Sequence, residues 1–390
     1  MFLCALCQRQ LSSTLIKFRY QRLWQNVQFH THPGLFYRPK LNEREERLEG
    51  VKFDVEKIPP RETIVTIEDE DAIKERYQTQ LQVEDWREQK ISLMQLPGIY
   101  MKLSKSNLTG LVVLTTLMGY SIASGPLQLE PLLWTVVGTG LCSAGANSIN
   151  QWIEVPFDCQ MARTRGRVLV RGVISSTHAM TFGITTGVAG TALLATMVNP
   201  LTALLGAANI LLYAAIYTPL KRFSIANTWV GSLVGAIPPL MGWVACTGHL
   251  DAGAFVLAGL LYAWQFFHFN SLSWGLRADY SRGGYQMAAV TDPDLCRRVA
   301  LRYSLAMVPI CVLGPVLGVT SWWFALDSLP LNVWLAYLGW SFYRDADFKS
   351  SRRLFHFSLF YLPLLMGLML INKKSHASST EGRDVAGTVK

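Results

Sequence analysis

Charged residues are scarce in this chain. Only 16% of its 390 residues are Asp, Glu, Lys or Arg, whereas 50% are hydrophobic. Soluble globular domains have about 25% charged residues, so this composition is unlike that of a water-soluble domain and favours a protein with several membrane spans. The seven cysteines show no metal-binding spacing apart from Cys4 and Cys7, which lie in a basic leader-like stretch. A cysteine-based metal site is therefore not expected.

Acids are absent from residues 1–40, which contain six Lys and Arg together with Ser12, Ser13 and Thr14. No clean apolar stretch precedes a small-residue cleavage site, so the composition predicts a mitochondrial presequence rather than a secretory signal. A basic, unstructured N-terminus is the alternative reading. The next stretch, 41–90, reverses the balance with fifteen acids against nine basic residues, which predicts a solvated segment with some helix near 68–90.

The rest of the chain consists of long apolar runs joined by short connections, and every second connection lacks Lys and Arg. Nine apolar runs are long enough, or nearly so, to cross a bilayer. They cover residues 107–124, 131–149, 172–197, 201–217, 228–247, 252–270, 299–324, 328–343 and 355–372. Basic residues occur in the second, fourth, sixth and eighth connections between these runs, and the other four connections have none. Under the positive-inside rule, the basic connections share one face, which would be the matrix face of the mitochondrial inner membrane.

These patterns predict an all-α membrane protein with about nine transmembrane helices. The expected parts are a presequence at 1–40, a charged soluble segment at 41–100, a membrane domain at 101–372 and a polar tail at 373–390. The basic residues alternate with membrane spans instead of forming one stripe, so nucleic acid is not an expected partner. Pro238 and Pro239 should kink or break the fifth run where other protein covers the backbone.

The stretch from Ala144 to Arg171 holds polar side chains at a fixed spacing. Asn150, Glu154 and Asp158 are four residues apart, so on a helix they form one stripe. Arginines without an intervening acid follow at 163, 165, 167 and 171. Carboxylates for a hard divalent cation beside arginines for an anion suit a diphosphate–Mg²⁺ site. The spacing alone fits equally well a polar helix end followed by a basic loop that anchors to the membrane.

A second polar cluster follows the sixth run, on the same face by the parity of the spans. It reads HFNSLSWGLRADYSRGGYQM over residues 268–287 and includes Arg277, Asp279 and Tyr280. The short segment 217–222, YTPLKR, adds Lys221 and Arg222 on that face. Three carboxylates with several cations are therefore expected at one end of the membrane domain.

In these polar segments the chain resembles the UbiA superfamily of intramembrane prenyltransferases. Within that superfamily it is most similar to the haem-modifying branch of protoheme IX farnesyltransferases. The blocks NSINQWIEVPFD (147–158), YTPLKRFSIANTWVG (217–231), GAIPPLMGW (235–243) and the 268–287 segment carry this resemblance. It implies a nine-helix UbiA-like bundle that transfers farnesyl from farnesyl diphosphate to a vinyl group of haem B, giving haem O for haem A and cytochrome c oxidase biogenesis. A homo-oligomer or a haem A synthesis partner is compatible with this role.

The resemblance also implies site residues. The candidate ligands of catalytic Mg²⁺ are Asn150, Glu154, Asp158 and Asp279. The candidate diphosphate contacts are Arg163, Arg167, Lys221, Arg222, Arg277 and Tyr280. The candidate haem contacts are His268 and His178, although for each a purely structural histidine is the alternative.

Several positions depart from the family pattern. Glu154 stands where an aspartate is usual, Val168 replaces a proline, and the second aspartate motif is reduced to Asp279. Pro156 lies inside the first motif and is a candidate end of its helix, which would relax the stripe. Two other functions stay open at this point: a UbiA-type enzyme that prenylates a quinone precursor, and a non-catalytic haem-handling transporter or scaffold.

Overall fold

The computed structural model describes residues 93–374, and this part of the chain is all-helical. The predicted presequence, most of the charged segment with its helix near 68–90, and most of the polar tail lie outside the described residues. Nine long helical segments lie at or close to the nine apolar runs. They are α6 (Ser106–Ile122), α7 (Leu129–Asp158), α8 (Ser176–Met197), α9 (Pro200–Leu211) continued by η3 (Leu212–Tyr217) and α10 (Thr218–Leu220), α11 (Asn227–Thr247), α12 (Ala252–Gly275), α15 (Pro293–Val316), α16 (Trp322–Asp345) and α17 (Phe348–Ile371).

Seven of these segments are long and apolar enough to cross a membrane; the other two are α6, with 17 residues, and α16. The membrane fold predicted from the sequence is thus confirmed. Shorter helices complete the described chain: η2 (Leu93–Gln95), α5 (Leu96–Leu103), α13 (Arg277–Arg282) and α14 (Ala288–Thr291). The predicted start of the membrane domain at residue 101 falls inside α5, and that boundary stays a prediction.

Side-chain caps set the start of most long helices. Asp251, Asp292 and Asp347 each accept a hydrogen bond from the backbone N–H three residues later, at the start of α12, α15 and α17. Ser175 and Asn199 do the same for α8 and α9. A cap satisfies one of the backbone donors that a helix start leaves free, so these polar residues fix where each span begins.

Two sequence expectations need correction, and a third is met only in part. The run at 299–324 joins parts of two helices: α15 ends at Val316, Gly318 turns the chain with φ +73°, and α16 begins at Trp322. Pro156 does not end its helix, since α7 continues to Asp158. Pro238 and Pro239 were expected to kink or break the fifth run where other protein covers the backbone. Both are buried, and α11 is not broken at them; a kink stays a prediction. They remove the backbone donors that would bond the carbonyls of residues 234 and 235, and those two residues line a cavity.

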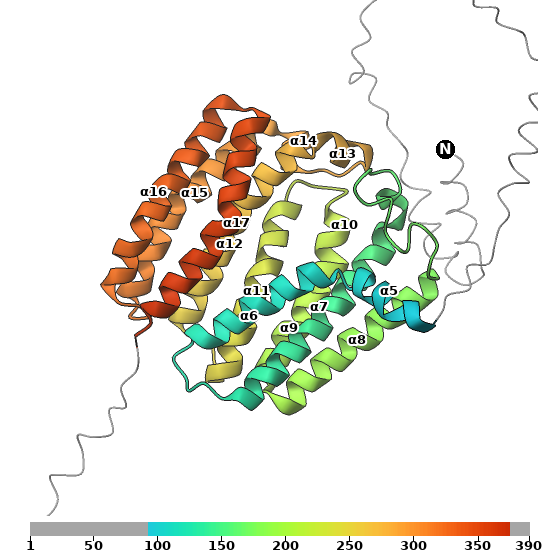
Figure 1. Cartoon of the computed structure of the whole chain (residues 1–390), viewed down its shortest axis with the longest axis horizontal. Coiled ribbons are helices and arrows are strands. Elements are labelled where there is room, and N and C mark those ends of the chain that lie inside the picture. The colour runs from blue at the N-terminus through green and yellow to red at the C-terminus, as the bar shows by residue number, and fades with distance from the viewer. Residues whose placement is uncertain (1–92, 375–390) are drawn as a thin grey trace, which may run out of the picture. The chain divides into compact units, whose positions relative to one another are not determined.

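The helices pack so that their connections gather at two ends (Figure 1). At one end, Asp279 of α13 accepts hydrogen bonds from the 159–175 connection, and Arg222 donates to the carbonyls of Gly283 and Gly284. At the other end, Lys373 donates to the carbonyl of Ser121. The first end holds the predicted basic connections, as the positive-inside pattern requires.

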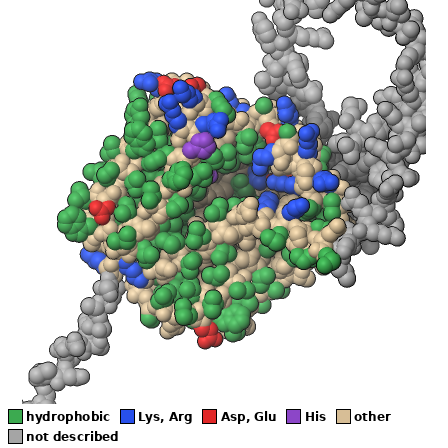
Figure 2. Space-filling model, in the orientation of Figure 1, with side chains coloured by type: hydrophobic (Ala, Val, Ile, Leu, Met, Phe, Trp, Pro, Cys, Tyr) green, Lys and Arg blue, Asp and Glu red, His purple; other side chains and the backbone are tan. Residues whose placement is uncertain are grey.

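The helices α6 and α17 meet at their C-terminal ends and diverge toward the basic end (Figure 1). Figure 2 shows a hollow in this face of the molecule, with Lys and Arg side chains along one side and histidine on the other. The helix α11 contacts α6, α9 and α12, and α12 in turn contacts α15 and α17. The bundle therefore surrounds a recess near its basic end.

Candidate active site

The predicted polar stripe lies on the last three turns of α7. Asn150, Glu154 and Asp158 are buried, with 0%, 4% and 1% of their surface exposed. Because α7 keeps its helical path through Pro156, the four-residue spacing holds all three on one face. Two carboxylates removed from water in this way need cationic partners to remain charged.

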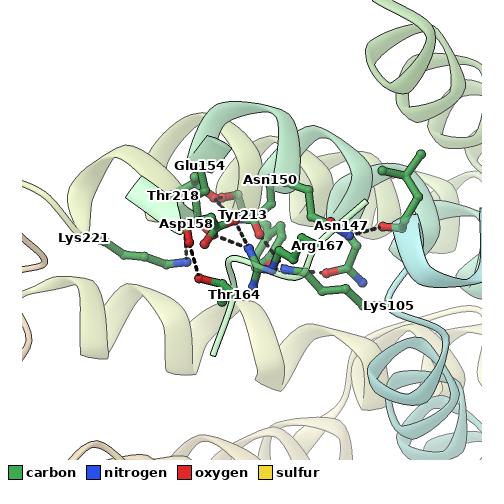
Figure 3. Close-up of polar contacts among 12 residues, drawn as sticks. Lys105, Asn147, Asn150, Glu154, Asp158, Thr164, Arg167, Tyr213, Thr218 and Lys221 are labelled. Atoms are coloured by element: carbon green, nitrogen blue, oxygen red, sulfur yellow. Dashed lines mark hydrogen bonds and ion pairs between the residues drawn. The ribbon is translucent and has the colours of Figure 1, made fainter. Parts of the chain in front are cut away.

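Three cations from three separate elements supply those partners (Figure 3). Lys221 Nζ lies 2.6 Å from Glu154 Oε1. Arg167 Nη1 lies 3.4 Å from Glu154 Oε2 and also pairs with Asp158 Oδ2. Lys105 Nζ donates to Asn150 Oδ1 at 2.6 Å. Three basic side chains thus surround the stripe, and each makes a charge-assisted hydrogen bond to it.

Local structure aims each cation at α7. Lys105 occupies the turn between α5 and α6 with φ +49°, a left-handed conformation that is uncommon for a residue with a side chain. Arg167 belongs to the 159–175 connection, which is pinned by the buried side chains of Met161, Val168 and Leu169. Lys221 follows α10, and its ammonium lies 4.5 Å from the centre of the Tyr217 ring. Backbone turns, and not one continuous element, therefore position these cations.

A π-helical turn, η3 (Leu212–Tyr217), connects α9 to α10 (Thr218–Leu220) beside the stripe. Single π turns often mark functional sites because they shift the side-chain register. Here the turn directs Thr218 Oγ1 to accept from Asn150 Nδ2 at 2.9 Å, and Tyr213 Oη to donate to Asn147 Oδ1 at 3.3 Å. These contacts orient the Asn150 amide so that its oxygen faces Lys105.

The charges of this cluster do not cancel. Glu154 and Asp158 carry two negative charges, and Lys105, Arg167 and Lys221 carry three positive ones when protonated. Burial, with the nearby Arg167 cation, lowers the pKa of Lys105 to about 7. Burial disfavours charged Lys221 as well, yet the Glu154 carboxylate outweighs it and holds the pKa of Lys221 well above its usual value. An anion bound beside Lys105 would therefore favour the charged form of this lysine.

The donor set of the stripe fits a divalent cation such as Mg²⁺. It consists of two carboxylates and one amide oxygen, the hard donors that Mg²⁺ prefers. Asp158 Oδ1 is buried and has no hydrogen-bond partner within the described residues, so this oxygen is available as a metal ligand. Among those residues, no three His, Cys, Asp or Glu side chains come together as a metal site. Water or diphosphate oxygens would have to complete the coordination.

Asp279, the fourth predicted ligand, makes other contacts. Its carboxylate accepts hydrogen bonds from the backbone N–H groups of Ala162, at 2.8 Å, and Arg163, at 3.4 Å. Arg282 Nη1 lies 3.8 Å from it. In this arrangement Asp279 braces the connection that carries Arg167, and the structure does not place it in the stripe of α7.

Of the predicted diphosphate contacts, some lie in the α7 cluster and others make contacts elsewhere. Arg167 and Lys221 belong to the cluster, whereas Arg163 is exposed, with its guanidinium 5.8 Å from the centre of the Tyr280 ring. Arg222 Nη1 donates to the carbonyls of Gly283 and Gly284, and its guanidinium lies 4.1 Å from the Phe157 ring centre. Arg277 packs on Trp274 at 3.9 Å. Arg222 and Arg277 therefore hold loops and helix ends in this structure.

The two predicted histidines have different surroundings. His178 Nε2 bonds the Tyr100 hydroxyl at 2.8 Å, in a shallow surface groove between α5 and α8. His268 lies on α12, with its Nδ1 2.7 Å from Ser358 Oγ of α17 and its ring stacked on Trp264 at 4.4 Å. Only His268 is thus held against a second membrane helix.

Several site residues were missed from the sequence. Lys105, Asn147, Tyr213 and Thr218 all bond within the cluster, and the lysine was the easiest to find, since it precedes the first run on the basic face. Tyr285 is also buried, packs edge-on to Phe157 at 6.0 Å, and has a hydroxyl without a partner among the described residues. Its position beyond Gly283 and Gly284 gave no signal of that burial.

A largely apolar cavity begins one helical turn from the stripe. It lies between α6, α7, α9 and α11, and both Asn147 and Tyr213 line it. Its apolar walls come from Leu108, Val112, Ile210, Val234 and Met241. Because Asn147 and Asn150 are neighbours on α7, the polar cluster and the apolar cavity adjoin.

The comparisons with known proteins agree with this architecture. Over 297 residues the chain is 57% identical to the protoheme IX farnesyltransferase, mitochondrial, of Homo sapiens; this covers 76% of the chain and 67% of the relative. A digeranylgeranylglyceryl phosphate synthase structure superposes with a TM-score of 0.62 at 14% identity, covering 70% of this chain and 97% of that one. A UbiA homologue from Archaeoglobus fulgidus, bound to DMAPP and Mg²⁺, gives 0.54 at 12% identity, covering 69% and 98%.

The structural matches share the fold at low identity. A family model is more specific, since the UbiA prenyltransferase family matches residues 112–362, which include the α7 stripe, the π-helical turn and the α12–α13 segment. With most of the membrane body inside that match, this chain belongs to the UbiA prenyltransferase family.

Proposed function

We propose that this chain is a protoheme IX farnesyltransferase, a haem O synthase that transfers farnesyl from farnesyl diphosphate to a vinyl group of haem B. The observation that carries this proposal is the 57% identity to the human mitochondrial enzyme of that name over 297 residues. The family match favours an enzyme over a transporter, and the haem-modifying relative favours this acceptor over a quinone precursor.

The cluster on α7 binds the diphosphate end of the donor. Lys105, Arg167 and Lys221 surround two carboxylates and leave one excess positive charge when all are ionised. As the bond between the farnesyl carbon and oxygen breaks, its electron pair leaves with the diphosphate. The three cations stabilise the negative charge that grows there, and such preorganised stabilisation is commonly the largest part of catalysis.

Glu154, Asp158 and Asn150 would hold Mg²⁺ together with the diphosphate, as the DMAPP- and Mg²⁺-bound relative suggests. When bound, this ion neutralises the diphosphate and makes it a better leaving group. Asp158 Oδ1 already lacks a partner among the described residues, and Asn150 and Glu154 would exchange their lysine contacts for it. Asp279 would act indirectly, by positioning the connection that carries Arg167.

The apolar cavity receives the hydrocarbon tail. Its walls are mostly aliphatic, and the polar side chains of Asn147 and Tyr213 mark the end nearest the diphosphate. Removing a long hydrocarbon chain from water is favourable in proportion to its area. Such a wall also keeps water from the allylic cation until the acceptor reaches it.

The acceptor step follows from the chemistry of the substrates. The π electrons of a vinyl group form a carbon–carbon bond to the allylic carbon, which leaves a cation next to the porphyrin ring. Water adds to that cation and loses one proton, which gives a hydroxyl beside the new farnesyl arm. Diphosphate and the proton are the remaining products, so atoms and charge balance.

The chain would act in the mitochondrial inner membrane, with its site toward the matrix. The mitochondrial relative and the acid-free first forty residues support the compartment, and the gathering of basic connections at the site end supports the orientation. Haem O would then be available for conversion to haem A by a partner enzyme.

The direct test is product formation. Purified full-length protein in detergent, given haem B, farnesyl diphosphate and Mg²⁺, should form a more hydrophobic haem with the mass of haem O. Replacing haem B with a phenolic quinone precursor should give no prenylated product. Prenylation of the quinone precursor without conversion of haem B would contradict the proposal.

A further inference from the structure

His268 is oriented by three neighbours. Its ring stacks on Trp264 with 4.4 Å between ring centres and 19° between planes, and it lies 5.1 Å from the Phe355 ring. Ser358 of α17 contacts both stacked rings. Its carbonyl accepts a hydrogen bond from Trp264 Nε1 at 2.8 Å, and its hydroxyl bonds His268 Nδ1 at 2.7 Å. A histidine fixed in this way has little rotational freedom.

The hydrogen bonds define which ring nitrogen carries the proton. The single hydroxyl hydrogen of Ser358 is donated to the carbonyl of Phe355 at 2.6 Å. Its oxygen therefore accepts from His268 Nδ1–H, which leaves a lone pair on Nε2. His268 Nε2 forms no hydrogen bond within the described residues. It is also not one of their buried polar atoms that lack a partner, so it is open to contact from outside the packed side chains. An oriented, accessible nitrogen lone pair is what an iron ligand requires.

The position of His268 suits the proposed reaction. The next residue on α12, Phe269, packs against the cluster of Met161, Tyr280 and Tyr285, whose border includes Phe157, the neighbour of Asp158. His268 therefore lies at the end of the bundle that carries the diphosphate cluster.

We infer that His268 Nε2 binds the iron of the porphyrin acceptor as an axial ligand, with Ser358 as the positioning residue that orients its ring. This inference rests on the proposed function, because it identifies how that acceptor is held. Binding the iron from one side fixes the macrocycle and leaves its edge, where the vinyl groups lie, free to face the allylic carbon. Trp264 would give the site an apolar wall.

Haem titration without farnesyl diphosphate tests the ligand separately from the transfer. The full chain in detergent should bind ferrous haem B with the iron–nitrogen stretch of a histidine complex in resonance Raman spectra. His268→Gly should lose that band, and added imidazole should restore it by entering the space left by the side chain. Restoration would show that the variant is folded and that the nitrogen, not the packing, was lost.

Three further variants sharpen the result. Ser358→Ala removes the acceptor of Nδ1–H, so haem affinity should fall about 10–100-fold, as expected for the outer partner of a metal ligand. His356→Gln, an exposed histidine on α17, and His178→Gln, whose Nε2 already bonds Tyr100, should keep the band. Persistence of the band in His268→Gly, or its loss in either control instead, would overturn the inference.

The farnesyl-transfer assay tests the proposed function separately from the assignment of His268 as the iron ligand. Wild-type protein that forms no farnesylated haem would contradict the proposed function, whatever the spectra show. Wild-type protein that forms the product, combined with a His268→Gly variant whose haem spectrum is unchanged, would contradict only the ligand. Product formation that falls in His268→Gly and recovers with imidazole would support both.

Discussion

At the scale of single residues, the two carboxylates of α7 do different things in the same surroundings. Glu154 pairs with Lys221 and Arg167 through separate oxygens, whereas Asp158 pairs through one oxygen and leaves the other unpartnered among the described residues. The unpartnered oxygen is the more available to a cation. Asp158 should therefore be at least as sensitive to charge removal as Glu154.

Asp158→Asn and Glu154→Gln keep size and polarity but remove the anion. Each should lower turnover by about 10²–10³-fold, the usual loss when one preorganised electrostatic contact is removed. Glu154→Asp keeps the charge and restores the residue usual in the family, so it should retain substantial activity. The measurement is haem O formed per unit of folded protein across a Mg²⁺ titration, in which the neutral variants should need more Mg²⁺ for half-maximal rate.

The control for this series is Arg298→Gln, an exposed residue at the start of α15. Its neighbour Arg297 would be a poor control, because it donates to the Tyr343 carbonyl and joins α15 to α16. Near-normal activity of both neutral α7 variants at limiting Mg²⁺ would remove the carboxylates from the metal site. The stripe would then be a buried ion-pair network that stabilises the helix end.

Lys105 gives a second test at this scale. Lys105→Met removes a partly buried ammonium that hydrogen-bonds Asn150, so the affinity for farnesyl diphosphate should fall about 10–100-fold, as for loss of a charged hydrogen bond worth about 1.5–3 kcal/mol. Lys102→Met, an exposed lysine one turn earlier in the sequence, is the matched control. Competition by inorganic diphosphate measures the affinity directly, and equal values for the two variants would exclude Lys105 from the anion site.

The sequence predicted the residues of this cluster that share a motif. Asn150, Glu154 and Asp158 follow from helical spacing, and Arg167 and Lys221 follow from their basic connections. The sequence places Lys105 on the basic face, but no motif links it to Asn150, which lies 45 residues later; the fold brings the two together. For Asp279, a carboxylate that binds backbone N–H groups looks the same in sequence as one that binds a metal. Contacts across the fold decide between these roles.

At the scale of helices, close approach decides how α6 meets α11. A Cβ atom on Gly119 would lie 2.1 Å from the carbonyl oxygen of Pro239, and one on Gly242 would lie 1.9 Å from the carbonyl oxygen of Thr116. Both distances involve backbone, which cannot turn aside as a side chain can. These two glycines therefore set the separation of the helices that border the apolar cavity.

Gly119→Ala should force α6 and α11 apart and lower the free energy of unfolding by about 1–3 kcal/mol, the usual cost of overpacking. Gly110→Ala lies on the same helix with nothing within 4 Å of the added carbon, so it should be neutral or slightly stabilising. Thermal unfolding in detergent, followed by circular dichroism, compares the pair. Equal midpoints would show that α6 and α11 do not need this contact.

Helix positions followed from the apolar runs, but helix details did not. The run at 299–324 hid a turn, because Trp322, Trp323 and Phe324 begin α16 and are as apolar as the helix before them. Pro156 was a candidate helix end, yet it lies in the last turn, where losing one hydrogen bond is tolerated. The π-helical turn at 212–217 has no residue signature, since it reads as ordinary apolar helix.

At the scale of the whole molecule, topology was the most predictable property. Lys and Arg are missing from every second connection, and the structure brings the basic connections together at the end that holds the α7 stripe. The charge of the connections and the position of the site thus have one cause. Basic connections stay on the side from which the chain inserts, and the same basic side chains are then at hand for an anionic substrate group.

Cysteine labelling tests this topology in mitochondria from which the outer membrane has been opened. In a background with Cys159 and Cys246 replaced by serine, cysteines at Ser124 and His249 should react with an impermeant maleimide. Both positions are exposed, in the α6–α7 and α11–α12 connections at the end opposite the site. Cysteines at Arg165 and Lys349, exposed in the basic connections, should react only after the inner membrane is made permeable. Labelling of positions 165 and 249 from the same side would contradict the arrangement, because α8, α9–α10 and α11 separate them by three spans and must place them on opposite faces.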